Sequence, residues 1–301
     1  MANTINCKEL YQWITEGHDF ILIDTLPPEH YESRHIAGAR NACVYEIDFL
    51  DTIRSFTSDT ETCIVLYDSS DRSRAAACAA EKLSAIGFQK VYELSGGIEE
   101  WEGTGYPVNV VGPELEEEPV LTNGTHQIDC TGSRFNWTGR NIFKKHFGTI
   151  TISGGELVVS NGEVTDGYIS LDMHTIRNID LENRDENSLL IRHLKSDDFF
   201  DVERFPSARF DLIECGVLVG ATPGSPNYFV KGNLTIKGVS KEVSIPAVIV
   251  PGEDGCIRAQ AWFDIDRTGW NVSYGSGKLF EKLGMHLVND TISLELNIIT
   301  R

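Results

Sequence analysis

The stretch Thr291-Ile292-Ser293-Leu294-Glu295-Leu296-Asn297-Ile298 decides the fold of the larger part of the chain. Apolar and polar side chains alternate along it, and this period of two is typical of a half-buried antiparallel strand. The segment Gly167-Tyr168-Ile169-Ser170-Leu171-Asp172-Met173 has the same pattern. Turn signals between such segments predict a meander of strands, and they stand at Ser153-Gly154-Gly155, Asn161-Gly162, Pro223-Gly224 and Pro251-Gly252.

The whole region from residue 125 to 301 is expected to form one all-β domain. Only Asn187 to Phe200 has a helical pattern within it. A long antiparallel sheet leaves exposed edges, and closure into a barrel removes them. We therefore predict an extended antiparallel β-barrel, closed or nearly closed.

Residues 1–110 have a different pattern, in which short apolar runs alternate with helical stretches. The runs Phe20 to Asp24 and Cys63 to Tyr67 are continuously apolar, as strands buried on both faces should be. Ser73 to Ile86 is rich in alanine and predicts a helix that ends before Gly87. This order predicts an α/β domain with a parallel sheet and helices on both faces. Residues 111–124, rich in Pro and Glu, are expected to be a linker between the two domains.

Composition narrows the class of partner. The chain has 301 residues, with 26 Lys and Arg against 45 Asp and Glu, and its formal net charge is −19. Such a charge disfavours nucleic acid and anionic membrane surfaces as partners. No apolar run reaches the roughly 18 residues of a membrane span, and the N-terminus lacks the pattern of a secretory signal. A cytoplasmic location is therefore expected.

Neither cysteines nor histidines predict a metal site. The seven cysteines are an odd number without a Cys-x-x-Cys pair, so most are expected to be buried free thiols. The histidines, among them His146, His174, His193 and His286, lack the paired spacing of a zinc site and are expected to be structural.

Several ordered motifs in residues 5–108 resemble the rhodanese-like family. They are Asp24, His35-Ile36-Ala37-Gly38-Ala39, Ile64-Val65-Leu66-Tyr67, Leu94-Ser95-Gly96-Gly97-Ile98-Glu99-Glu100-Trp101 and Gly105-Tyr106-Pro107-Val108. In active members, the resemblance implies, a loop that follows the central strand begins with a catalytic cysteine. Here that loop reads Asp68-Ser69-Ser70-Asp71-Arg72-Ser73-Arg74. It is also one residue longer than the usual sulfurtransferase loop, as in related phosphatases.

Asp68 stands where the resemblance places the nucleophile. A carboxylate cannot accept a sulfane sulfur as a persulfide, and its charge opposes an anion in the loop. We therefore expect an inactive sulfurtransferase fold with no catalytic residue in the loop. Arg72 and Arg74 either hold an anion or pair with Asp68 and Asp71. The alternative is a sulfurtransferase or phosphatase-like enzyme that uses a non-standard nucleophile such as Ser70 or Cys78.

A second set of motifs resembles the YceI family over residues 125–300. They are Arg192-His193-Leu194-Lys195-Ser196-Asp197-Asp198-Phe199-Phe200-Asp201, Phe205-Pro206-Ser207-Ala208-Arg209-Phe210, Val230-Lys231-Gly232-Asn233-Leu234-Thr235-Ile236-Lys237-Gly238 and Phe263-Asp264-Ile265-Asp266-Arg267-Thr268-Gly269-Trp270. The resemblance implies a lipocalin-like barrel that binds a polyisoprenoid or quinone-like lipid, with no required cofactor.

Aromatic residues are the candidates for the barrel interior. An eight-stranded barrel is just wide enough either to fill with side chains or to hold one slender ligand. The candidates therefore either line a tunnel or close a solid core, and they are Phe135, Trp137, Phe143, Phe147, Phe199, Phe210, Trp262 and Trp270.

The combined features predict a non-catalytic protein of two domains. Its barrel is expected to bind an elongated apolar ligand. The rhodanese-like domain is expected to dock a protein partner or to act as a sensing unit. A scaffold that binds proteins and no small ligand is the remaining alternative.

Overall fold

The structure is a computed structural model that describes residues 3–112, 120–252 and 254–301. The chain divides into two compact units, Met1–Glu117 and Glu118–Arg301, and each is described by itself. Half of the linker expected over 111–124, residues 113–119, lies outside the described residues. Within those residues, no helix has both the length and the apolar character needed to cross a bilayer.

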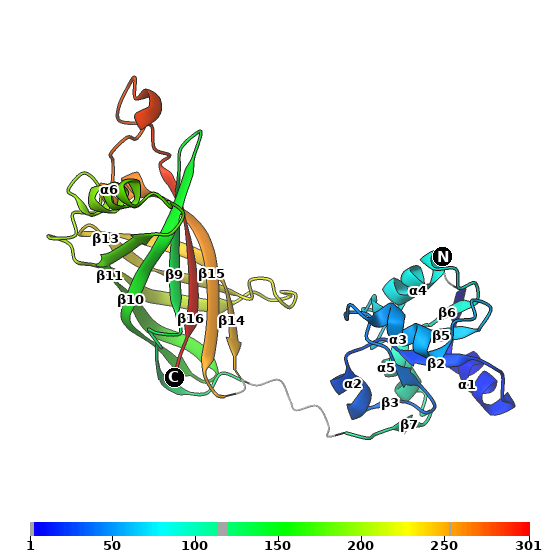
Figure 1. Ribbon diagram of the computed structural model, residues 1–301. Helices are drawn as coiled ribbons and strands as arrows, with labels where there is room; N and C mark the ends of the chain where they lie inside the picture. Colours follow the sequence, from blue (N-terminus) through cyan, green and yellow to red (C-terminus); the bar gives the residue numbers. More distant parts are fainter. Residues whose placement is uncertain (1–2, 113–119, 253) are drawn as a thin grey trace. The chain divides into compact units, whose positions relative to one another are not determined.

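The first unit is built on a five-stranded parallel sheet with the strand order β1-β6-β5-β2-β4 (Figure 1). Its elements are β1 Asn3–Ile5, α1 Cys7–Glu16, β2 Ile21–Asp24, α2 Pro28–Ser33, β3 His35–Ile36, β4 Arg40–Asn41, α3 Phe49–Phe56, β5 Ile64–Tyr67, α4 Ala75–Ala85, β6 Val91–Leu94, α5 Gly97–Gly103 and β7 Val108–Asn109.

Helices cover both faces of this sheet, so the expected α/β arrangement is confirmed. One core packs α3 and α4 against the sheet through residues such as Ile53 and Leu83. The other core packs α1 and α5 against the opposite face through Leu10 and Trp101. All residues of the central strand β5 are buried, because both faces of that strand are covered.

The second unit is a closed antiparallel barrel, as expected. Its elements are β8 Gly124–Gln127, β9 Arg134–Arg140, β10 Lys145–Ser160, β11 Glu163–Asn178, α6 Arg184–Lys195, β12 Ser207–Val217, β13 Tyr228–Ile236, β14 Val239–Pro251, β15 Ile257–Asp266, the 3-10 turns η1 Arg267–Trp270 and η2 Gly284–His286, and β16 Thr291–Ile299. Among the described residues, strands β9 to β16 form the ring, which β10 closes by pairing with β11. Strand β8 pairs with the C-terminal part of β10, through residues 156–159.

Helix α6 lies across one end of the barrel, and the C-terminus lies at the other end (Figure 1). The helix begins earlier than expected, because the Asn183 side chain accepts hydrogen bonds from the amides of Asp185 and Glu186. It ends at Lys195, so Phe199 and Phe200 follow the helix rather than belong to it.

One predicted turn is wrong. Ser153-Gly154-Gly155 lies inside strand β10, next to a register shift between Ile152 and Gly154. A Cβ on Gly155 would lie 2.5 Å from the Tyr168 carbonyl oxygen, so this glycine permits close approach of two strands. Asn161-Gly162 forms the expected hairpin turn, with φ values of 55° and 77°.

A buried carboxylate ends strand β2 of the first unit. Asp24 is 1% exposed, and its Oδ1 accepts a hydrogen bond of 2.9 Å from the Leu26 amide. Its Oδ2 has no partner among the described residues. Burial raises the pKa of Asp24 to about 6. In the folded protein Asp24 therefore keeps its proton over a pH range in which the unfolded chain has lost it.

Replacing Asp24 with Asn is expected to stabilise the first unit at neutral pH. The contribution of Asp24 to wild-type stability falls as pH rises from about 4 to about 6, by roughly 3 kcal/mol in all, because ionisation of this group costs more in the folded state. Asn keeps Oδ1 and carries no charge. The difference in the free energy of unfolding between Asp24→Asn and wild type should therefore be larger at pH 7.5 than at pH 4 by this amount. Urea unfolding at pH 4 and pH 7.5 measures it. The exposed Asp19→Asn is the control, and a difference independent of pH contradicts the expectation.

Candidate functional site

Two apolar cavities lie inside the barrel. The first, here called the far cavity, has a volume of about 110 Å³. The second, here called the α6-side cavity, has a volume of about 170 Å³ and includes Leu190 and Leu194 of α6 in its wall. The two cavities have four lining residues in common, which are Phe135, Leu171, Leu234 and Leu294. They therefore adjoin one another.

The cavities follow one another along the barrel strands. On β16, Ile292 lines only the α6-side cavity, Leu294 lines both, and Leu296 and Ile298 line only the far cavity. The alternation that predicted the strand thus points one row of side chains into both cavities. The interior space is accordingly elongated along the strands.

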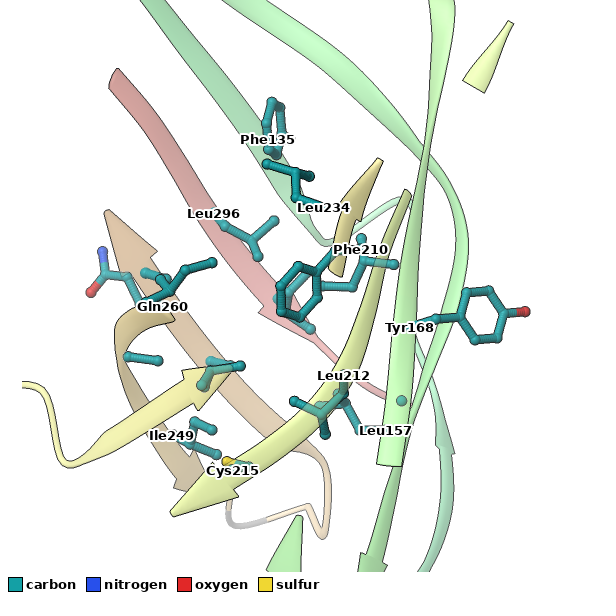
Figure 2. A pocket seen from close by; sticks show the side chains of 18 of the residues that line it. Phe135, Leu157, Tyr168, Phe210, Leu212, Cys215, Leu234, Ile249, Gln260 and Leu296 are labelled. Carbon is teal, nitrogen blue, oxygen red and sulfur yellow. The ribbon is translucent and has the colours of Figure 1, made fainter. Parts of the chain in front are cut away.

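The wall of the far cavity is apolar on its inner side. Figure 2 shows Phe210, Leu212, Leu296 and Ile249 around this space, whereas Tyr168 and Gln260 point away from it. Ala247 and Ala261, neighbours across β14 and β15, leave room at this part of the wall. The space suits hydrocarbon, because few polar groups reach it.

Four of the eight aromatic candidates line the cavities. Phe135 lines both, Phe210 lines the far cavity, and Trp137 and Phe199 line the α6-side cavity. Their strands position them, since Phe135 and Trp137 are two residues apart on β9 and face the same side.

The other four candidates do not line either cavity: three of them are outside the solid core as well, which corrects the expectation for those three, whereas Trp270 has the solid-core position that was the open alternative. Phe143 is 79% exposed in the turn between β9 and β10, and Trp262 is 48% exposed. Because Ala261 and Phe263 border the far cavity, the period of two directs Trp262 to the outer face. Phe147 alternates with His146 on β10 and has Lys145 over its ring. Trp270 is buried as solid core, with Nε1 donating to the Leu234 carbonyl at 2.8 Å.

Some lining residues were missed from the sequence because aromatic type was the criterion. They include Leu171, Leu234 and Leu294, and the glycine Gly139. The signal that finds them is alternation, because each is an even number of residues from another lining residue on its strand. Glycines also make room for aromatic rings: a Cβ on Gly232 would lie 2.3 Å from the Phe210 ring.

The loop that follows β5 is filled by its own side chains. Asp68 is 5% exposed, and its Oδ2 accepts a hydrogen bond of 3.0 Å from the Ala76 amide at the start of α4. Asp71 Oδ1 accepts from the Gly96 amide at 2.7 Å. Ser73 Oγ accepts from the Ala75 amide at 3.2 Å. Three amides at or beside the loop, those of Ala75, Ala76 and Gly96, are therefore bonded to side chains of the loop itself.

The two loop arginines pair with glutamates rather than with Asp68 and Asp71. Arg72 lies 3.6 Å from Glu99, and Arg74 lies 3.8 Å from Glu81, and all four side chains are exposed. A shallow surface pocket lies at the loop. One basic residue, Arg72, lines it together with three acidic residues, and the full lining is Ser70, Asp71, Arg72, Gly96, Glu99 and Glu100. Its charge disfavours an anion.

The two alternative nucleophiles have ordinary surroundings. Cys78 packs partly buried against the core on the α4 side, and Ser70 Oγ accepts a weak hydrogen bond of 3.4 Å from the Arg72 amide. All seven cysteines are free thiols; three are buried, namely Cys7, Cys43 and Cys256, and four are partly buried. Among the described residues, no three His, Cys, Asp or Glu side chains form a cluster that could hold a metal ion.

Removing the Asp68 carboxylate is expected to destabilise the first unit. In Asp68→Ala, the Ala76 amide loses its acceptor in a buried position, and loss of such a cap costs about 1 kcal/mol. Thermal unfolding measures the loss. Asp68→Asn keeps an acceptor oxygen and should recover most of it, whereas equal stability of wild type and Asp68→Ala would contradict the capping role.

Comparison with known proteins assigns both units. A rhodanese-like domain model matches residues 6–104, and a YceI-like domain model matches residues 126–300. A UPF0312 protein from Shewanella denitrificans is 30% identical over 101 residues, which are 33% of this chain and 48% of the relative. The chain thus spans about half the length of the curated relative that it matches.

Solved structures resemble each unit. BcnA from Burkholderia cenocepacia has 18% identity and a TM-score of 0.46, with 58% of this chain and 99% of that chain covered. A polyisoprenoid-binding domain from Saccharophagus degradans has 12% identity and a TM-score of 0.44, with coverages of 61% and 99%. The BH2092 protein from Bacillus halodurans has 26% identity and a TM-score of 0.35, with coverages of 38% and 85%.

The YceI-like match covers more than half of the chain, and it coincides with the barrel that encloses the two cavities. The rhodanese-like match coincides with the parallel sheet and its altered loop. The chain therefore belongs to the YceI-like family and has a rhodanese-like domain before its barrel.

Proposed function

We propose that the barrel binds one elongated, single-chain lipid of polyisoprenoid or quinone-like type. The observation that carries the proposal is the pair of adjoining apolar cavities along the barrel strands. Protein interiors pack as densely as organic crystals and contain few voids larger than a water molecule. Two adjoining voids, each many times the space that one water needs, are better explained as a binding site than as a packing defect.

The lining favours a hydrocarbon occupant over water. A buried water needs two to four polar partners, and the far cavity has almost none on its inner side. Each methylene transferred from water into such a space contributes about 0.8 kcal/mol. An elongated chain gains this contribution along the whole row from Ile292 to Ile298, whereas a compact ligand would occupy only one cavity.

A direct binding measurement tests the proposal. The full chain, stripped of lipid by organic solvent and refolded, is titrated with geranylgeraniol in the presence of N-phenyl-1-naphthylamine, and displacement of the dye is followed. Saturable binding of one lipid per chain is expected. Failure of geranylgeraniol, menaquinone and palmitate all to displace the dye from a folded chain would contradict it.

We further propose that the rhodanese-like domain is a non-catalytic docking or sensing unit. This proposal is supported by Asp68, whose carboxylate caps α4 where a nucleophilic thiol would stand. Thiosulfate:cyanide and aryl phosphatase assays of the full chain should show no turnover above the buffer rate. Turnover that is lost in Ser70→Ala or Cys78→Ala would overturn the proposal and support the enzymatic alternative.

A further inference from the structure

Two polar side chains face the α6-side cavity from neighbouring strands. In the ladder between β9 and β10, Trp137 pairs with Gly148, and Gly139 pairs with His146. Trp137, Gly139 and His146 all line this cavity. Trp137 and His146 are therefore diagonal neighbours on the inner face, a relation in which long side chains reach the same space.

The indole of Trp137 has an unused hydrogen-bond donor. Its Nε1 is buried and has no partner among the described residues. Buried donors are almost always bonded, and one that is not calls for an explanation. The ring packs close to the backbone of Gly148, where a Cβ would lie 2.9 Å from the indole. The donor is thus fixed beside the cavity and available to an acceptor on a ligand.

His146 has one ring nitrogen engaged and one available. Its Nδ1 lies 2.9 Å from Asp180 Oδ2. Asp180 Oδ1 also accepts from the Phe147 amide at 2.8 Å and from Asn178 Nδ2. Burial raises the pKa of Asp180, but these hydrogen bonds, with that of His146, outweigh it and lower the pKa overall. Asp180 is then an ionised acceptor for the proton on Nδ1, and in the tautomer with its proton there Nε2 is an acceptor.

Free space lies next to these two groups. Gly139 stands opposite His146, and a Cβ built on it would meet no atom within 4 Å. The lining around this point includes Arg140 and Lys144, but Arg140 is turned to Ser293, to which its Nη1 donates at 2.7 Å. Trp137 and His146 therefore offer a donor and an acceptor from neighbouring strands at this point, and the Lys144 ammonium is a further donor in the lining.

We propose that this corner binds the head group of the lipid and that the head group is a hydroxyl, as in a prenyl alcohol or a prenylated phenol. The inference rests on the proposed lipid binding by the barrel. A hydroxyl oxygen accepts from Trp137 Nε1 while its proton is donated to His146 Nε2, so one group satisfies both. A carbonyl oxygen can use only the donor, and a hydrocarbon end uses neither.

Three ligands with the same hydrocarbon chain measure the contribution of each of the two hydrogen bonds. Farnesol, its methyl ether and the parent hydrocarbon are compared by dye displacement on the full chain. The ether keeps the acceptor and lacks the donor, and the hydrocarbon lacks both. The wild type should bind the alcohol about threefold to tenfold more tightly than the ether, and the ether more tightly than the hydrocarbon by a similar factor.

Variants of Trp137 and His146 show which residue causes each of the two affinity differences. His146→Phe should make the alcohol and the ether equal, and Trp137→Phe should make the ether and the hydrocarbon equal. Binding of the hydrocarbon by each variant shows that its barrel is folded. His174→Phe and Trp262→Phe change exposed side chains of the same types and should leave all three affinities unchanged.

The outcomes are distinct. Equal affinities of the wild type for all three ligands would overturn the hydroxyl site and leave the barrel's lipid binding in place. Preferences that persist in both variants would overturn the assignment to Trp137 and His146. Failure of the wild type to bind any of the three would contradict lipid binding itself.

Discussion

Ala261→Phe is expected to weaken binding of a long polyprenol such as solanesol several hundredfold while leaving farnesol bound. Ala261 is 6% exposed on β15 and borders the far cavity, so a phenyl ring there occupies space that the end of a long chain would fill. Excluding one isoprene unit removes about five carbons at about 0.8 kcal/mol each, about 4 kcal/mol in all, which corresponds to roughly a 700-fold loss of affinity. Farnesol is much shorter, so with its head group in the α6-side cavity it is expected to extend less far toward Ala261.

The neighbouring position on the same strand provides the control. Gln260 is exposed and points away from the cavity (Figure 2), so Gln260→Phe should bind both ligands as the wild type does. Ala247→Phe, opposite Ala261 on β14, should reproduce the effect of Ala261→Phe. Equal loss of farnesol and solanesol, or no loss of either, would contradict the arrangement of two cavities in series.

Arg267→Ala is expected to lower the stability of the barrel unit by about 3–5 kcal/mol, and its melting temperature by about 10 °C. Arg267 is 3% exposed and donates to three carbonyl oxygens, those of Asn289 at 3.0 Å, Val272 at 2.6 Å and Val288 at 3.1 Å. In Arg267→Ala these three carbonyl oxygens lose their hydrogen-bond donor, and the nearby Asp290 loses the positive charge of Arg267. Differential scanning calorimetry measures the change.

Lys278→Ala removes a cation from the same region and serves as the control. Lys278 also contacts Asp266 and Asp290, but its side chain is 60% exposed. Solvent screens exposed pairs, so little change in melting temperature is expected. If the two variants melted alike, burial of Arg267 would not be the reason for its contribution.

The fold was predictable because periodicity reports directly on burial. The alternation from Thr291 to Ile298 and the continuous run from Ile64 to Tyr67 correctly indicated an antiparallel and a parallel sheet. The error at Ser153-Gly154-Gly155 arose because glycine has two uses, in turns and where two strands approach closely. Without the partner strand in view, the sequence does not separate the two.

The interior was only partly predictable from residue type. Trp137 and Trp262 are both tryptophans in strands, yet one borders a cavity and the other faces outward. Trp137 is two residues from the lining residue Phe135, whereas Trp262 is one residue from the lining residue Ala261. An even or odd separation from a known lining residue is therefore a better criterion than residue type. The pairing of Asp68 with the Ala76 amide could not be predicted, because it depends on the path of the loop.

Three expectations from the sequence stay predictions. They are the domain limits with the linker at 111–124, the cytoplasmic location, and a protein partner of the rhodanese-like domain. The first concerns a segment of which half, residues 113–119, lies outside the described ranges. Limited proteolysis of the full chain would test it, with cleavage between residues 111 and 124 as the expected result.

Native mass spectrometry tests the central claim most directly. The full chain is purified from its own source without detergent and sprayed from a volatile buffer. We expect most wild-type molecules to have the mass of the chain plus one lipid and to release that lipid on activation. If the lipid is a long-chain one, most Ala261→Phe molecules should lack it. A folded wild-type chain that has only its own mass, both as purified and after incubation with geranylgeraniol, would contradict the account.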